Sequence, residues 1–189
     1  MTAHETTLIE QARLGNSEAF GELMQLHQDR LFTSMVHITR CHADAEDVVQ
    51  VAFIDTFRKL DRFRGQSSFY TWLYRIAFNR SVDQRRRRRP ALSLDAIEAQ
   101  LRQQPCSDDS SPSRPLELRE QSQRVQRALQ ALAERDRAIL ILREWEQFDY
   151  ATISEVLDLT LGTVRSRLHR ARSRLREELK RLGAVAKDD

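Results

Sequence analysis

Arginine is the residue type whose spacing in this sequence points most clearly to chemistry. Residues 160–176 contain six arginines and neither aspartate nor glutamate. A solvated helix face normally mixes charges of both signs, so a face of one sign favours an anionic partner outside the protein. Duplex DNA is such a partner, because guanidinium groups bind phosphates and can grip the O6 and N7 atoms of guanine. The residues predicted to contact duplex DNA are Thr163, Arg165, Ser166, Arg167, His169, Arg170 and Arg172.

The residues around this segment predict two short helices joined by a tight turn. Asp149 can cap the first helix, Asp158 can adopt a left-handed conformation in the turn, and Thr160 can cap the second helix. In the second helix, apolar residues spaced by three and four are predicted to pack inward: Leu161, Val164, Leu168, Ala171, Leu175 and Leu179. Two helices of this kind with a basic outward face are typical of a helix-turn-helix.

Aromatic residues are concentrated at residues 69–78. Phe69 and Trp72 fit an inward face, and core packing is the favoured interpretation for both. The residues on a different face, Tyr70, Tyr74 and Phe78, either pack against a neighbouring helix or form a platform on which unpaired bases stack. Three polar residues nearby are candidates for phosphate and base-edge contacts, namely Arg75, Asn79 and Arg80.

Five consecutive arginines follow at residues 85–89. Like charges repel one another, so this run is either a solvated extension of the helix or a contact to backbone phosphates. In the second case it contributes affinity more than sequence choice.

Prolines divide the chain. All four lie within residues 90–115, in a segment that also holds the acidic residues Asp108 and Asp109. Both flanks show helical periodicity without the strict alternation typical of strands. We therefore predict an all-α protein of two small helical domains, residues 5–89 and 118–182, joined by a flexible linker of residues 90–117. Asp44 and Ser67 are predicted N-caps of helices in the first domain.

Other classes of protein fit the sequence poorly. Two cysteines without CxxC spacing make a disulfide framework improbable, and neither a secretory signal nor a membrane-spanning segment is present. His37, Cys41 and His42 lack a fourth ligand for zinc. There is no phosphate-binding glycine loop or nucleophile motif, so we expect a soluble, cytoplasmic protein that is not an enzyme and holds no metal or cofactor.

The two segments DVVQVAFIDTFRKLDRFRGQSSFYTWLYRIAFNR and GTVRSRLHRARSRL together resemble the extracytoplasmic-function (ECF) sigma factors of bacterial RNA polymerase, and especially the RpoE-like members. The resemblance covers about 150 residues and both predicted domains in order. It implies a sigma factor that binds core polymerase and directs promoter-specific initiation. The first domain is then sigma region 2, which reads the −10 element as single strand, and the second is sigma region 4, which reads the −35 element as duplex.

The same resemblance assigns roles to residues. It implies docking on the β′ coiled coil through Asp44, Glu46, Asp47, Gln50, Phe53 and Arg58, whereas the second domain sits on the β flap. The residues expected to contact the −10 element are Arg64, Gln66, Ser67, Tyr70, Trp72, Arg75, Asn79, Arg80, Arg85 and Arg86. Within residues 62–68, Gln66 and Ser67 are the predicted donors of a pocket for a flipped-out base, although a simple interhelical turn is the alternative.

Further expectations concern partners. The acidic linker suggests a strand that imitates nucleic acid in a basic channel. Many relatives are held by an anti-sigma factor, which makes one a possible partner here, and the chain is expected to be monomeric outside the holoenzyme. One alternative is a conventional helix-turn-helix regulator that binds an operator as a dimer, and another is an adaptor whose basic helices contact only protein.

Overall fold

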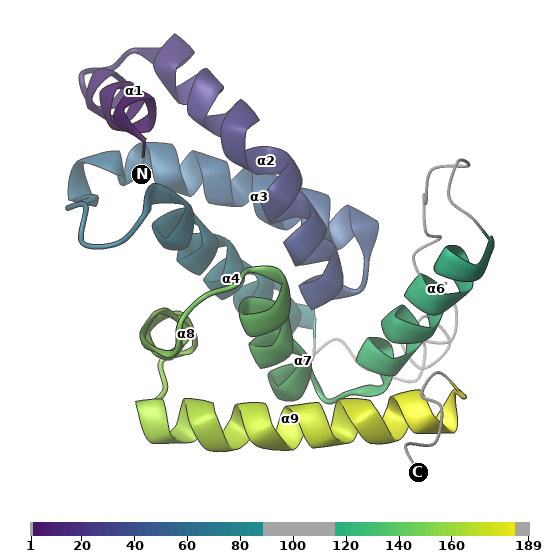
Figure 1. The fold of residues 1–189 in the computed structure, drawn as a ribbon. Helices are drawn as coiled ribbons and strands as arrows, with labels where there is room; N and C mark the ends of the chain where they lie inside the picture. The colour runs from purple at the N-terminus through teal and green to yellow at the C-terminus, as the bar shows by residue number, and fades with distance from the viewer. Residues whose placement is uncertain (1, 89–115, 184–189) are drawn as a thin grey trace. The chain divides into compact units, whose positions relative to one another are not determined.

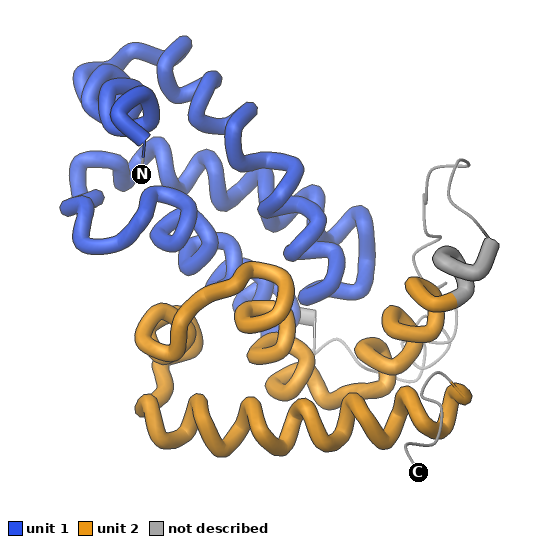
Figure 2. Tube along the Cα trace, in the orientation of Figure 1, with its two compact units in different colours: residues 1–105 blue, residues 106–189 orange. Residues whose placement is uncertain are grey.

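The computed structural model describes residues 2–88 and 116–183. All regular elements in these two ranges are helices, and the chain divides into two compact units, residues 1–105 and 106–189 (Figures 1 and 2). The all-helical prediction is confirmed. The predicted linker falls largely outside the described residues, but helix α6 begins at Leu116, two residues before the predicted start of the second domain.

The first unit contains four α-helices within the described residues. They are α1 (Ala3–Arg13), α2 (Ser17–Thr39), α3 (His42–Arg58) and α4 (Phe69–Arg88), with the short helix η1 (Leu60–Arg62) after α3. Helices α2, α3 and α4 pack against one another, and α1 packs against α2 (Figure 1). Their shared core includes the fully buried side chains of Leu23, Leu31, Met35, Phe69, Leu73 and Tyr74.

The second unit is built around its last helix. It comprises α6 (Leu116–Ala131), α7 (Glu134–Leu140), a π-helical turn η3 (Ile141–Trp145), α8 (Tyr150–Leu157) and α9 (Leu161–Arg181). Helices α6, α7 and α8 each contact α9. The core is formed by side chains that include Leu129, Ile139, Leu140, Ile141, Leu142, Ile153, Val164 and Leu168.

The helix caps of the second unit follow the sequence prediction. The carboxylate of Asp149 accepts a hydrogen bond of 2.8 Å from the backbone N–H of Thr152, and Thr160 Oγ1 accepts one of 3.2 Å from Thr163. Asp158 has a φ of 52° and ends α8 in the left-handed region. The short aspartate side chain tolerates this conformation better than a branched one.

Two predicted caps in the first unit are wrong. Helix α3 begins at His42, so its N-cap is Cys41 and Asp44 lies in the first turn, where the helix dipole favours an acid. The left-handed residue Arg40, with a φ of 66°, ends α2 early enough for this start. The cap of α4 lies one position after the predicted Ser67, because Ser68 Oγ accepts the hydrogen bond from the Thr71 N–H at 3.0 Å.

Asp149 provides a test of capping in the second unit. The hydrogen bonds from Thr152 hold the pKa of the Asp149 carboxyl below its ordinary value of 3.8. A lowered pKa in the folded state means that this stabilisation is present above pH 4 and is lost as the pH falls through the folded pKa. Replacing Asp149 by Ala should lower the free energy of unfolding of this unit by about 1 kcal/mol at pH 7.

The measurement is urea unfolding of the full chain, followed by Trp145 fluorescence in a Trp72→Phe background. Asp149→Asn is the matched control, since it keeps the acceptor oxygen but removes the titrating group, and its smaller loss should not depend on pH. If Asp149→Ala lowers the free energy of unfolding by the same amount at pH 3 as at pH 7, the ionised carboxylate is not the cap that we assign.

Candidate nucleic-acid interfaces

Helix α9 presents one polar face to solvent. Val164, Leu168 and Ala171 are buried, and their side of the helix packs against the rest of the unit. The opposite side therefore exposes the predicted DNA-contacting residues Arg165, Ser166, His169 and Arg170. Thr163 and Arg167 are half-buried at the flanks, and the Thr163 hydroxyl lies 2.8 Å from Thr160 Oγ1.

One residue of the predicted inward stripe of α9 points elsewhere. Leu161 is 48% exposed, so the prediction that it packs inward is wrong. It is the first residue of the helix, and burial begins one turn later, at Val164. Leu175 and Leu179 are half-buried.

Two of the six arginines in residues 160–176 are paired with carboxylates on other helices of the unit. Arg172 donates to Glu144 Oε1 from Nε at 3.0 Å and from Nη2 at 2.7 Å, and Arg174 donates to the buried carboxylate of Asp136. The expectation that every counter-charge lies outside the protein is therefore wrong for these two side chains. Their partners are on η3 and α7, which inspection of α9 alone does not reveal. Arg165, Arg167, Arg170 and Arg176 have no carboxylate partner among the described residues.

The tyrosine stripe of α4 is part of the core. Tyr70 is 5% exposed, Tyr74 is fully buried and Phe78 is 9% exposed. The guanidinium of Arg30 lies 4.2 Å from the centre of the Tyr70 ring, and Tyr74 Oη lies 3.0 Å from Ser34 Oγ. The interpretation of this stripe as a base-stacking platform is wrong, and so is the prediction that Tyr70 contacts the −10 element, because its ring faces are covered.

Another face of α4 carries the exposed residues that were predicted to contact the −10 element. Arg75 and Asn79 are exposed, and Trp72 is half-exposed at the preceding turn of the same face. The Trp72 ring is supported from below by Phe63 and Phe69, with centroids at 5.2 and 6.1 Å. Trp72, Arg75 and Asn79 thus form a strip on α4 that is open to solvent and combines an aromatic ring, a cation and an amide.

The cations near the end of α4 differ in their surroundings. Arg80 is half-buried and its Nε donates to the buried carboxylate of Asp55 in α3, so it serves as a counter-ion and is not the free phosphate ligand that we predicted. Arg85 is half-buried and engaged in contacts within the chain, whereas Arg86 is exposed. Residue 89 lies outside the described residues.

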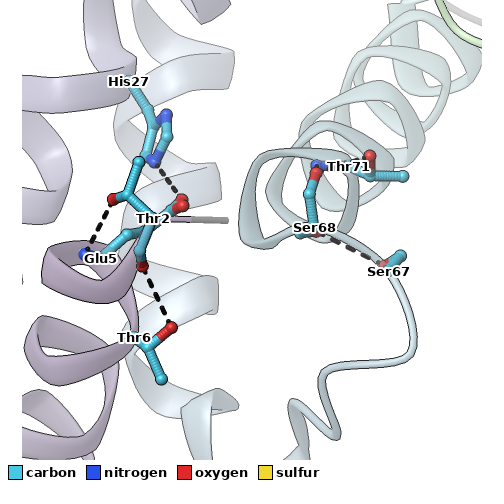
Figure 3. Close-up of polar contacts among 7 residues, drawn as sticks. All are labelled: Thr2, Glu5, Thr6, His27, Ser67, Ser68 and Thr71. Atoms are coloured by element: carbon cyan, nitrogen blue, oxygen red, sulfur yellow. Dashed lines mark hydrogen bonds and ion pairs between the residues drawn. The ribbon is translucent and has the colours of Figure 1, made fainter.

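The loop of residues 64–68 stands between η1 and α4. Gly65 has a φ of 68°, which only glycine adopts without strain, and the side chains of Arg64 and Gln66 are exposed. Ser67 turns its hydroxyl toward the Ser68 carbonyl at 3.4 Å, while Ser68 Oγ lies 2.9 Å from Thr71 Oγ1 (Figure 3). Of the two predicted donors of the base pocket, Gln66 is therefore more accessible than Ser67.

Sequence reasoning missed a contact at the start of this loop. Arg13 Nη2 donates hydrogen bonds of 3.0 Å to the carbonyls of both Asp61 and Phe63. No sequence pattern signals it, because about 50 residues separate the partners.

Helix α3 has an outward stripe that combines charges with apolar side chains. Asp47, Gln50 and Arg58 are exposed as the docking prediction requires, and Glu46 is exposed beside them. Phe53 is 3% exposed and packs in the core, so its predicted role in docking is wrong. Asp44 is half-buried and has a contact within the chain.

Val51 and Ile54 complete the stripe and were missed. They are 41% and 46% exposed and share the face of Asp47, Gln50 and Arg58 at helical spacing. The exposure of these two residues could have been predicted from the helical spacing of residues 47–58. Val51 and Ile54 fall on the same helix face as Asp47, Gln50 and Arg58, so they cannot lie on the opposite, buried face. Exposed apolar groups with a polar rim mark protein interaction sites.

Further observations bear on the remaining expectations. No helix among the described residues is long and apolar enough to cross a membrane. Within the same residues, no three His, Cys, Asp or Glu side chains gather as a metal site would need. Asp108 and Asp109 of the acidic linker lie outside them.

Comparisons with known proteins agree with this geometry. Residues 23–91 match the family model of Sigma-70 region 2, and residues 122–175 match that of Sigma-70, region 4. The chain is 38% identical over 173 residues to the ECF RNA polymerase sigma-E factor of Escherichia coli (strain K12), covering 89% of this chain and 90% of the relative. It is 37% identical to the RNA polymerase sigma-H factor of Pseudomonas aeruginosa, with 93% of each chain covered.

Solved structures show the same likeness. The sigma factor RpoE of Bartonella quintana, solved with the anti-sigma factor NepR, superposes with a TM-score of 0.68 at 27% identity, covering 85% of this chain and 96% of that one. CnrH, solved with the cytosolic domain of CnrY, gives 0.67 at 26% identity and covers 94% and 97%. The resemblance read from the sequence is confirmed: this chain belongs to the ECF sigma factors of the sigma-70 family and is an RNA polymerase sigma factor.

Proposed function

We propose that the two units divide promoter recognition between them. Residues 118–182 bind the −35 element as duplex through the exposed face of α9. Residues 5–89 bind core polymerase through α3 and the single-stranded −10 element through α4 and the preceding loop. The observation that carries this proposal is the presence of a different exposed surface on each unit: arginines without a carboxylate partner among the described residues lie on α9, and an apolar stripe lies on α3.

The residue assignment is narrower than sequence reasoning alone suggested. On α9, Arg165, Ser166, His169 and Arg170 lie at the centre of the DNA-facing surface, with Thr163 and Arg167 at its flanks. In the first unit, the assignment rests on Arg64, Gln66, Ser67, Trp72, Arg75 and Asn79, with Arg86 as a phosphate contact. Arg80 acts through its ion pair with Asp55.

We define the docking stripe as Asp47, Gln50, Val51, Ile54 and Arg58. Its apolar centre and charged ends suit a helical protein surface better than a nucleic acid, which supports docking on the β′ coiled coil of polymerase. The stripe also argues against a dimeric helix-turn-helix repressor, which has no need of a second docking unit.

The proposal has consequences for chemistry, location and partners. In this proposal nucleotide addition belongs to the polymerase, so the chain acts without a catalytic group of its own. Its place of action is then the cytoplasm, where the polymerase works. Two of its solved relatives are in complex with other proteins, NepR and the cytosolic domain of CnrY. We infer that an anti-sigma factor can likewise hold this chain by covering the same exposed surfaces.

The decisive experiment for the proposed function is run-off transcription with purified bacterial core polymerase and a promoter library. Transcripts should arise only when this protein is added, and the active templates should share two elements separated by a constant spacing. Initiation that is independent of the protein would reject the proposal, and templates with a single palindromic element would favour the repressor.

A substitution on α9 tests base reading. Arg170→Ala should weaken binding to the selected −35 duplex by about 1–3 kcal/mol and relax the preference at one base pair. Arg172→Ala is the matched control, because Glu144 already engages that guanidinium. Binding selections with randomised duplexes measure both. An unaltered preference in Arg170→Ala, or an equal change in Arg172→Ala, would contradict the assignment.

A second pair of substitutions tests docking on polymerase. Ile54→Glu would place an unpaired carboxylate in the buried contact and should weaken binding to core polymerase by about thirtyfold, or about 2 kcal/mol. Asp47→Arg should act in the same direction. Leu26→Glu on α2, where Leu26 is 55% exposed, is the control and should bind normally. Fluorescence anisotropy with labelled protein gives the affinities, and normal binding of Ile54→Glu would exclude the docking stripe.

A further inference from the structure

Arg13 joins the amino-terminal helix to the loop of residues 64–68. It is the last residue of α1, and its Nη2 donates to the carbonyl oxygens of Asp61 and Phe63, each at 3.0 Å. Asp61 belongs to η1, and Phe63 directly precedes the loop. Helix α1 contacts η1, and it lies beside the turn between α3 and α4 in Figure 1.

The loop needs anchors at both of its ends. Its middle is exposed and contains a glycine in the left-handed region, so little within residues 64–66 fixes their position. At the far end, Ser68 caps α4 through Thr71. At the near end, the Phe63 ring is 5% exposed and packs edge-on against Phe69, with centroids at 5.8 Å.

Arg13 holds the backbone at the near end, where the ring of Phe63 fixes only the side chain. The short helix η1 leaves carbonyls without helical partners, and a guanidinium is a charge-assisted donor that can hold two of them in a fixed relative position. The hydrogen bonds therefore set the direction in which the chain leaves Phe63 for Arg64 and Gln66.

We propose that Arg13 is a positioning residue for capture of an unpaired promoter base by residues 64–68. This inference rests on the proposed function, in which Gln66 and Ser67 contact that base. It adds α1, which lies outside the segment matched to Sigma-70 region 2, to the elements that determine −10 selectivity. Binding groups must be held within about 0.5 Å of their productive positions, so an untethered loop loses selectivity before it loses its fold.

The attachment of α1 itself does not depend on Arg13. Leu8, Ile9 and Ala12 are buried against the unit, and the Glu5 carboxylate accepts a hydrogen bond of 3.0 Å from His27 Nε2 of α2 (Figure 3). Burial holds the pKa of His27 below its ordinary value, although Glu5 acts in the opposite direction. Removing Arg13 therefore leaves α1 in place, and Glu5→Gln changes a different contact of α1 while leaving the Arg13 hydrogen bonds to the loop intact.

The test compares four variants of the full chain in holoenzyme with core polymerase. The variants are Arg13→Met, Arg13→Lys, Gln66→Ala and Glu5→Gln. The probe is a forked DNA whose duplex arm carries the −35 element recovered in the promoter selection and whose single-stranded arm is random in sequence. Sequencing of the bound fraction gives the base preference at each position, and anisotropy gives the affinity for core polymerase.

We expect Arg13→Met to lower the preference for the favoured base about fivefold at the one position where Gln66→Ala lowers it. A fifth protein that combines Arg13→Met with Gln66→Ala should lose no more there than Gln66→Ala alone, because Arg13 acts through the loop. Arg13→Lys should retain part of the preference. Affinity for core polymerase should stay unchanged in all, and Glu5→Gln should select bases normally.

Limited proteolysis supplies a readout that does not involve DNA. Trypsin should cleave after Arg64 several times faster in Arg13→Met than in the parent chain or Glu5→Gln, because the released loop can adopt the extended form that a protease binds. Unchanged cleavage would overturn the anchoring role.

The outcomes separate this inference from the proposed function. If Gln66→Ala changes the base preference but Arg13→Met does not, the positioning role is rejected while the loop assignment stands. If neither changes it, the loop assignment fails as well. If Glu5→Gln, which leaves the Arg13 hydrogen bonds intact, reproduces the Arg13→Met defect, that defect does not report those hydrogen bonds and the inference is overturned.

Discussion

Burial of Val164, Leu168 and Ala171 fixes the rotation of α9, and the function of the second unit depends on that rotation. The position of a residue in a helix fixes the direction of its side chain around the helix axis. Burying these three side chains therefore forces Arg165, His169 and Arg170 to the opposite side. The Asp149 and Thr160 caps and the left-handed turn at Asp158 place α8 and α9 in the geometry of a helix-turn-helix. Apolar packing and backbone turns thus determine which cations are exposed on α9, and in the proposed function these are the cations that reach DNA.

Ion pairs with carboxylates of the same chain further reduce the number of arginines available to DNA. A buried carboxylate is costly unless it is paired, and Asp136 and Asp55 obtain their counter-ions from Arg174 and Arg80. Glu144 engages Arg172 in the same way at a more exposed site. In the proposed function these arginines therefore stabilise the fold more than they bind DNA, and the DNA-binding surface is formed by the arginines that have no carboxylate partner in the part of the chain that the structure describes. The count of arginines in a segment overestimates the number available to phosphates.

Local signals in the sequence predicted the local structure well. The all-helical class, the helix-turn-helix, its caps and the exposed centre of α9 all follow from residues that lie a few positions apart. Long-range pairing could not be predicted, because the partners of Arg13, Arg80, Arg172 and Arg174 lie between 25 and 50 residues away. Burial of Tyr70 was equally open, since a helix with apolar groups on two faces does not reveal how many neighbours cover it. The exposure of Val51 and Ile54 was readable from periodicity and was overlooked.

The salt dependence of binding to duplex DNA tests most directly the claim that rotation and internal pairing select the functional arginines. Each phosphate contact contributes about 0.9 to the slope of log affinity against log salt. For the full chain on a −35 duplex, Arg165→Ala should reduce the slope by about that amount, whereas Arg174→Ala should leave it almost unchanged. Equal reductions for the two variants would mean that internal carboxylates do not sort the arginines, and the account would be wrong.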